Sequence, residues 1–182
     1  MKICIDPGHS GPVEPGAVAG DMTEADLNMA IAFSTGAALT AAGHEVLFTR
    51  QGDIADTGLT CRANLANEWP ADLFLSIHCN AFSSTDACGV ETYHYPDSVA
   101  GQALAAAIQS QLAGLNYTAD RGVKEARFTV LEATAMPAVL VECGFISAVQ
   151  DRTILITPAW QGKIGQAIAD GVQGYLQKSS RR

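Results

Sequence analysis

Three apolar segments of the chain each lead to a side chain that can take part in acid–base or metal chemistry. His9, His78 and Glu142 each follow one of these segments. Short apolar runs bounded by turn residues indicate buried strands. The carboxyl ends of parallel strands meet at one edge of a sheet, where α/β proteins bind their ligands. We therefore expect these three side chains to lie close together.

A fourth polar residue, Glu24, begins the first predicted helix and can face the same edge of the sheet. The helix dipole alone favours a carboxylate at that position, and His78 could equally be a hydrogen-bonded loop histidine. Glu142 is harder to explain as a structural residue. A buried carboxylate needs a partner, and no lysine or arginine lies near it in the sequence.

Two histidines and one carboxylate form the ligand set of hydrolytic zinc sites, which leave one coordination position open for water. Zinc lowers the pKa of such a water from about 15.7 to about 7. A second carboxylate that is not a ligand can then accept the water's proton. As a set, His9, Glu24, His78 and Glu142 meet these requirements.

The elements that must position these residues alternate between strands and helices, which predicts an α/β fold. We expect a single three-layer domain, with a twisted, mostly parallel sheet of about six strands and helices on both faces. Strands are predicted at 2–6, 45–49, 72–77, 90–95 (nearer the sheet edge), 128–131 and 138–141. Helices are predicted from a cap at Thr23 to a stop at Gly43, and at 59–68, 98–112 and 158–177; loops are predicted at 11–22 and 114–127. The domain covers residues 1–177, and 178–182 form a polar tail.

The composition narrows the class of protein. With 182 residues, 48% of them hydrophobic, the chain can bury one core. The net charge of −8 argues against nucleic acid or an anionic membrane as a partner. No apolar run is long enough to span a membrane, and no signal peptide precedes the first strand. The five cysteines are odd in number and do not suggest a disulfide framework.

Four separated segments match, in order, the motifs of a known enzyme family. They are Ile5-Asp6-Pro7-Gly8-His9-Ser10-Gly11, Glu24 with Asn28, Ser76-Ile77-His78-Cys79-Asn80-Ala81, and the stretch from Pro137 to Ser147. The resemblance is to the zinc-dependent N-acetylmuramoyl-L-alanine amidases of the type-3 family, and it covers about residues 2–176. Ser10, Cys79 and Ala148 depart from the usual family residues, but none of them replaces a ligand.

The resemblance implies one zinc ion held by His9, Glu24 and His78, with Glu142 as the catalytic carboxylate. The implied substrate is peptidoglycan, and the implied reaction is hydrolysis of the amide between the lactyl group of N-acetylmuramic acid and the L-alanine of the stem peptide. Such an enzyme acts on the bacterial cell wall. We expect a monomer, made in the cytoplasm and released by another route, as a compact phage-type endolysin is, or else a fragment of a longer exported protein.

Four residues are predicted to contact the substrate: Ser10, Asn80, Arg121 and Lys124. Arg121 and Lys124 lie in a predicted loop, where they can meet substrate carboxylates. Arg50 and Arg62 are instead expected to brace the interior.

Three alternatives remain open at this stage. Cys79 and Cys143 adjoin His78 and Glu142, which suggests a cysteine hydrolase, although neighbours on an extended chain point to opposite faces. A zinc peptidase that cleaves within the stem peptide would use the same metal chemistry. A non-catalytic cell-wall-binding module would not need Glu142 beside the metal.

Overall fold

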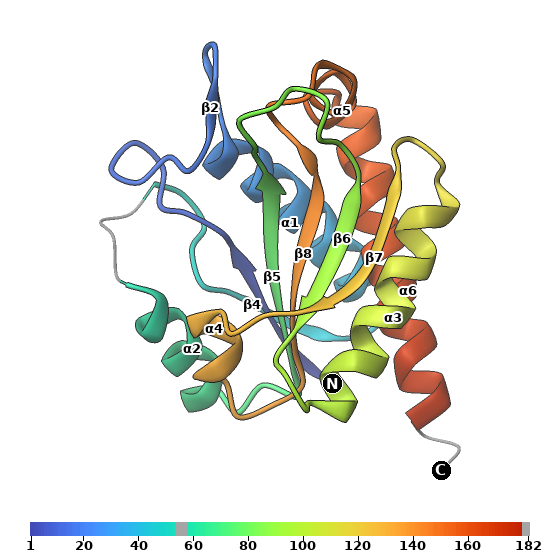
Figure 1. Ribbon diagram of the computed structural model, residues 1–182. Coiled ribbons are helices and arrows are strands. Elements are labelled where there is room, and N and C mark those ends of the chain that lie inside the picture. The colour runs from blue at the N-terminus through green and yellow to red at the C-terminus, as the bar shows by residue number, and fades with distance from the viewer. Residues whose placement is uncertain (54–57, 180–182) are drawn as a thin grey trace.

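The computed structural model describes residues 1–53 and 58–179, in which a six-stranded sheet lies between two layers of helices (Figure 1). In spatial order the strands are β4 (Glu45–Phe48), β1 (Lys2–Pro7), β5 (Leu73–Asn80), β8 (Ala138–Phe145), β6 (Val90–His94) and β7 (Asp120–Glu125). The first four strands in this order are parallel to one another, β6 is antiparallel to β8, and β7 is parallel to β6. The three-layer α/β prediction is confirmed, with two reversed strands at one edge.

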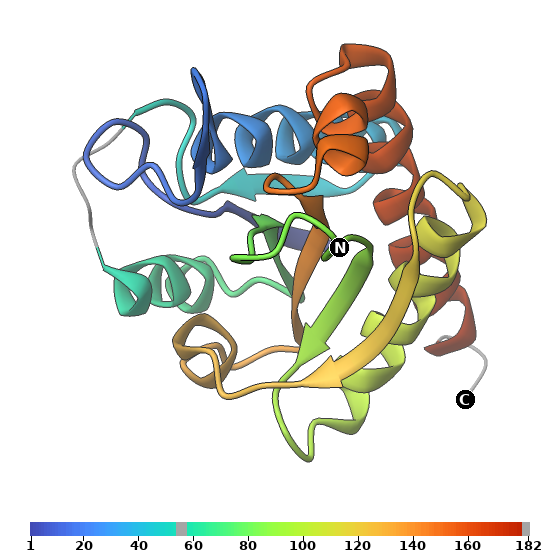
Figure 2. The same ribbon diagram turned by 45° about the horizontal axis from the view of Figure 1, so that its top comes forward.

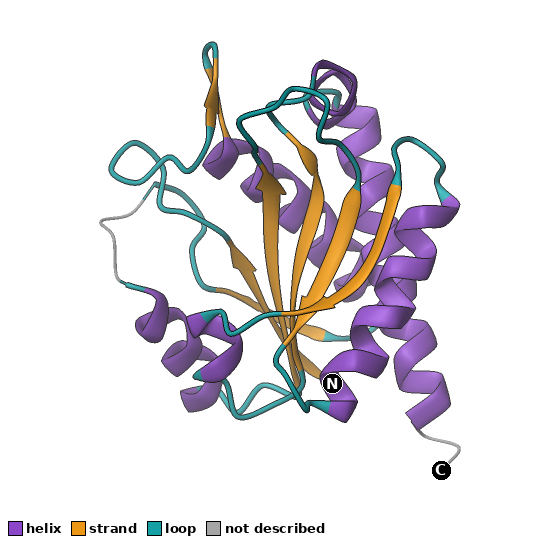
Figure 3. Ribbon diagram, in the orientation of Figure 1, coloured by secondary structure: helices purple, strands orange, loops and turns teal. Residues whose placement is uncertain are grey.

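The two helical layers differ in size. One face of the sheet is covered by α1 (Glu24–Ala41), α3 (Val99–Gly114) and α6 (Pro158–Ser179). Within the described part of the chain, the other face carries only α2 (Leu59–Glu68) and the short α4 (Thr129–Glu132) (Figure 2). Helix α5 (Val149–Leu155) follows β8, and β2 (Val18–Ala19) pairs with β3 (Met22–Thr23) in a hairpin. Figure 3 shows that α2 and α4 leave the part of their face toward the carboxyl ends of β5 and β8 without a covering helix.

Side chains alternate between the two faces along each strand, and this alternation places the polar residues. The apolar cluster beneath α2 and α4 includes Cys4, Phe74 and Leu140. Two residues further along β8 comes Glu142, and four further along β5 comes His78. Both therefore point to the sparsely covered face, beyond the end of the apolar cluster.

The first helix begins and ends where its sequence predicts. The Thr23 hydroxyl accepts a hydrogen bond from the Asp26 amide at 3.2 Å, which caps the first turn. Gly43 has a positive φ of 85°, and the amides of Gly43 and His44 bond to the carbonyls of Thr40 and Leu39. The N-terminal cap at Thr23 fixes Glu24 as the first helical residue.

Two predicted elements are wrong. Residues 128–131 were expected as a strand, but Thr129–Glu132 form helix α4, in which the adjacent residues Val130 and Leu131 are both buried. A half-covered strand would bury only alternate residues. The segment 114–127 was expected as a loop, but it contains β7. This edge strand lacks an apolar pattern, and its pairing with β6 sets it.

Other boundaries are shifted. Strands β5 and β8 are longer than predicted, so His78 and Glu142 lie within strands and not after them. The predicted loop 11–22 contains β2 and the start of β3, and α5 was not predicted. Of the predicted tail, Lys178 and Ser179 belong to α6, and 180–182 lie outside the described residues. None of the described helices is both long and apolar enough to cross a membrane.

Candidate metal centre and active site

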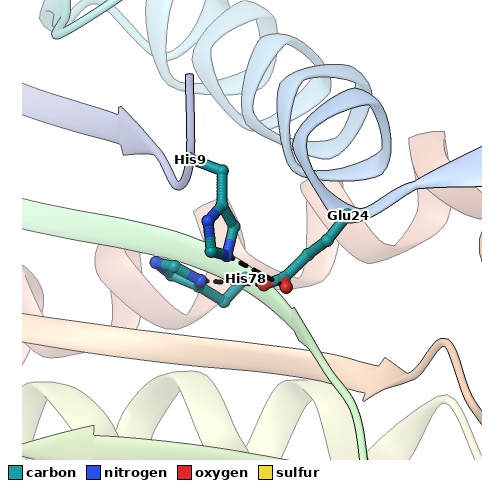
Figure 4. Close-up of side chains that lie close together, drawn as sticks. All are labelled: His9, Glu24 and His78. Carbon is teal, nitrogen blue, oxygen red and sulfur yellow. Dashed lines mark hydrogen bonds and ion pairs between the residues drawn. The ribbon is translucent and has the colours of Figure 1, made fainter. Parts of the chain in front are cut away.

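Three predicted ligands converge at the carboxyl ends of β1 and β5 (Figure 4). The Glu24 carboxylate lies between two imidazole rings, with one oxygen 2.9 Å from His9 Nε2 and the other 2.9 Å from His78 Nδ1. One donor atom from each residue lies within 4.8 Å of the other two. The three residues span 69 positions of the sequence, from His9 to His78, yet the sheet and the first turn of α1 bring them together.

The backbone around these ligands is shaped to bring them close. His9 itself adopts a positive φ of 66°, a conformation that non-glycine residues rarely take and that often marks functional positions. A Cβ atom on Gly8 would collide with the His78 ring. Gly8 therefore supplies space, while the turn itself relies on His9 and on Gly11, whose φ is 99°.

Gly16 offers a test of this close packing. A Cβ at this position would lie 2.6 Å from His9 Nε2 and 2.7 Å from a Glu24 oxygen. We expect Gly16→Ala to displace both ligands and weaken zinc affinity by about 10- to 100-fold, the range found when groups that orient metal ligands are disturbed. The control is Gly20→Ala, because Gly20 has a similar φ of 66° but no atom within 4 Å of an added Cβ. Equal zinc affinities in the two variants, measured by competition with a chelating dye, would contradict this explanation.

The three side chains shift one another's pKa values. Burial opposes ionisation of Glu24, but hydrogen bonds from His78 and His9 outweigh it and hold the pKa of this carboxyl well below its usual range. Burial alone would lower the pKa of both histidines, but the Glu24 carboxylate raises it above the ordinary value. The Glu24 carboxylate is thus negative at neutral pH and can bind a cation together with the two imidazoles.

A second carboxylate orients His9. The Glu14 side chain is hydrogen-bonded to His9 Nδ1, which leaves Nε2 facing Glu24. Such carboxylate–histidine pairs fix the ring that binds a metal. The local turn places Glu14, since the Ser10 amide donates to its carbonyl at 2.9 Å. Sequence reasoning missed this residue, although its position five residues after His9 in a Gly- and Pro-rich turn was a usable signal.

Glu142 stands beside the ligand cluster. It is level with His78 across the β5–β8 pair, and its Oε2 atom is buried and makes no hydrogen bond among the described residues. Burial raises the pKa of this carboxyl to about 7. A carboxyl group that is not committed to a structural bond and titrates near neutral pH can accept and return a proton.

The cluster opens into a pocket of about 680 Å³, a volume typical of small-ligand sites. The pocket is bounded by the ends of β1, β5 and β8, by the start of α2 and by the segment entering α4. Arg62 braces one side, because it forms a buried ion pair with Asp6 at 2.9 Å and donates to the His9 carbonyl at 2.7 Å. Arg50 likewise donates to the Gly8 carbonyl. Both arginines brace the interior, as expected.

The predicted substrate contacts fall into two groups. Asn80 lines the pocket. Ser10 is fully buried, and its hydroxyl accepts a bond from Arg62 at 3.2 Å. Arg121 and Lys124 both pair with Glu91, a residue that the sequence reasoning did not single out. The described residues that line the pocket do not include Ser10, Arg121 or Lys124.

Glu91 is the centre of a buried hydrogen-bond network next to the pocket. Its carboxylate accepts bonds from Arg121, Lys124, Tyr93 and Asn80. Burial alone would raise the pKa of Glu91, but these cations and hydrogen bonds lower it. The network fixes the amide of Asn80 at the pocket wall and ties β7 to β6. Glu91 lies opposite Glu142 on the adjacent strand, a register that strand pairing sets and that the sequence alone does not reveal.

Comparison with known proteins matches residues 3–174 to the model of a family described as N-acetylmuramoyl-L-alanine amidase. The chain belongs to this family. It is 40% identical over 177 residues to the N-acetylmuramoyl-L-alanine amidase LytC of Bacillus subtilis (strain 168), covering 96% of this chain but only 35% of LytC. It is 39% identical to the sporulation-specific N-acetylmuramoyl-L-alanine amidase of the same organism, covering 95% of this chain and 67% of that protein.

The fold agrees with this membership. The crystal structure of an N-acetylmuramoyl-L-alanine amidase from Clostridium difficile 630 superposes with a TM-score of 0.92 at 34% identity, covering 97% of this chain and 96% of that one. The mixed six-stranded sheet with its unequal helical layers is therefore the fold of an amidase catalytic domain.

The cysteine-hydrolase alternative finds no support in this site. Cys79 is fully buried on the opposite face of β5 from His78, within the cluster under α1, α3 and α6. Burial raises the pKa of both the Cys79 and the Cys143 thiol, so neither supplies a thiolate at neutral pH. The two cysteines act as core residues.

Proposed function

We propose that this chain is a zinc-dependent N-acetylmuramoyl-L-alanine amidase that hydrolyses the amide joining the lactyl group of N-acetylmuramic acid to the L-alanine of the peptidoglycan stem peptide. The observation that carries the proposal is the juxtaposition of the His9–Glu24–His78 cluster with the unpartnered Glu142 carboxylate in one pocket. Since the chain spans about a third of LytC, the proposal concerns this domain. We further propose that it acts on the bacterial cell wall as a monomer.

The donor set fits zinc. Two imidazole nitrogens and one carboxylate are the ligands of hydrolytic zinc sites, and Gly8 and Gly16 leave room for the ligands to approach one another. Zinc bound by His9, Glu24 and His78 would polarise the scissile carbonyl and lower the pKa of a nearby water. Glu14 would hold His9 in the required tautomer.

The remaining chemistry falls to Glu142. Its free oxygen accepts a proton from the attacking water and delivers a proton to the nitrogen of the leaving alanine. A pKa near 7 suits both steps, because a group poised at the working pH both takes up and releases protons. The Glu91 network keeps Asn80 in place along the substrate path.

Mass spectrometry of purified peptidoglycan digests tests the proposal. We expect complete stem peptides that begin with a free L-alanine and glycan strands that keep their length. The products should disappear with a chelator and return with added zinc. Shortened stem peptides would favour the zinc-peptidase alternative instead. Zinc-loaded protein that binds peptidoglycan and releases nothing would favour the wall-binding module.

A further inference from the structure

The pocket lining includes four carboxyl groups, Asp6, Glu14, Glu24 and Glu142, so a peptide that brings a carboxylate of its own needs a cation among the other lining residues. The titratable residues lining it are Asp6, His9, Glu14, Glu24, Arg62, His78, Arg127 and Glu142. Of the two arginines, Arg62 is buried and already neutralised by Asp6. Arg127 is therefore the lining cation that can meet a carboxylate of the substrate.

Arg127 is held in place without being neutralised. It lies on the segment between β7 and α4, which crosses in front of the sheet (Figure 1). Its Nη1 donates to the Tyr95 hydroxyl at 2.7 Å, and its guanidinium carbon lies 5.4 Å from the centroid of that ring. Among the described residues it forms no ion pair.

The segment that carries Arg127 is bonded to the end of β6 on one side and continues into the first turn of α4 on the other. The Ala126 amide donates to the His94 carbonyl at 3.1 Å, and the Leu131 amide donates to the Phe128 carbonyl at 2.9 Å. The Tyr95 hydroxyl in turn donates to Glu132 at 3.0 Å. The guanidinium is thus positioned in advance, with donors left over for a planar anion such as a carboxylate.

We infer that Arg127 binds a carboxylate on the second residue of the stem peptide and makes the domain selective for peptides in which that carboxylate is free. This inference rests on the proposed function. The acidic residue follows the L-alanine whose nitrogen leaves, and an extended residue advances the chain by only about 3.3–3.6 Å, which keeps it within the same pocket. Amidation of the carboxylate would remove the charge that the guanidinium recognises.

Arg121 and Lys124 are weaker candidates for this task. Both are paired with the buried Glu91 carboxylate, so a substrate carboxylate would have to compete with it. Arg127 faces no such competition, because the group to which it donates, the Tyr95 hydroxyl, is neutral.

The test compares two synthetic substrates, N-acetylmuramoyl-L-alanyl-D-γ-glutamyl peptides with the α-carboxyl group either free or amidated. We expect the zinc-loaded wild-type chain to favour the free acid in kcat/KM by roughly 10-fold, the worth of one charge-assisted hydrogen bond. In Arg127→Ala this ratio should fall to about 1, through loss on the free acid. In Arg127→Lys it should be intermediate, because lysine keeps the charge but loses the planar fork.

The matched control is Lys163→Ala, which removes one exposed positive charge from α6 on the other face of the sheet. Its ratio should equal that of the wild type. Because the measure is a ratio of two substrates, partial unfolding of a variant cannot imitate the effect. An unchanged ratio in Arg127→Ala, or a wild-type ratio of 1, would overturn this inference but leave the proposed function standing. If the wild type turned over neither substrate, both the proposed function and this inference would be overturned.

Discussion

Replacing Glu142 with glutamine is expected to lower kcat for hydrolysis of the lactyl–alanine amide by about 10²–10⁴-fold, the usual contribution of a general acid–base group. Glutamine keeps the shape of the side chain but cannot accept the proton of the attacking water. Zinc content should stay at one ion per chain, because Glu142 is not among the three residues whose donor atoms cluster. Parallel measurements of turnover and of bound zinc check both halves of the prediction.

The control for this variant is Glu68→Gln, which alters an exposed carboxylate at the end of α2. It should retain both activity and zinc. A Glu142→Gln enzyme with near-normal turnover would refute the role given to this residue. A variant without zinc would instead show that Glu142 belongs to the metal site.

The same pair of variants has a second readout in the metal-free protein. Burial raises the pKa of Glu142 from 4.5 to about 7, so between these values the folded chain holds a proton that the unfolded chain has lost. The free energy of unfolding should therefore fall as pH rises from about 4.5 to about 7, by up to about 3 kcal/mol from this group. Urea unfolding at several pH values should show this contribution in Glu68→Gln and lack it in Glu142→Gln.

Loss of zinc is the expected result of replacing either His9 or His78 with alanine. Each variant keeps two of the three donors, and two donors do not hold zinc in the manner of a three-ligand hydrolytic site. For the wild type, free zinc at about 100 times its Kd should raise the free energy of unfolding by about 2.7 kcal/mol. In either variant this zinc-dependent gain should fall close to zero.

His44→Ala serves as the control, since His44 lies at the turn before β4 and contacts Gln173 of α6, away from the cluster. Its zinc-dependent gain in stability should match that of the wild type. Undiminished zinc binding by both His9→Ala and His78→Ala, measured by elemental analysis after dialysis, would refute the assigned ligand set.

The strands and the helix that carry the proposed catalytic and metal-binding residues could be predicted because local physics marks them. Apolar runs locate the cores of β1, β5 and β8, and Thr23 and Gly43 mark the ends of α1. Parallel strands that share a carboxyl edge then bring His9, His78 and Glu142 together. Strand β7 and helix α4 could not be found in this way, because long-range pairing and packing set their conformations, not a local apolar pattern.

The sequence by itself determined the residues that we propose do the chemistry and the edge of the sheet where they meet, since both follow from residue type and strand direction. Only the tertiary structure decided which groups surround them. Glu14 reaches His9 through a turn, Glu91 holds Arg121 and Lys124, and Arg127 enters the pocket from a segment that crosses the sheet. The Glu91 and Arg127 contacts join elements distant in sequence, and a partner across such a distance leaves no mark in the local pattern.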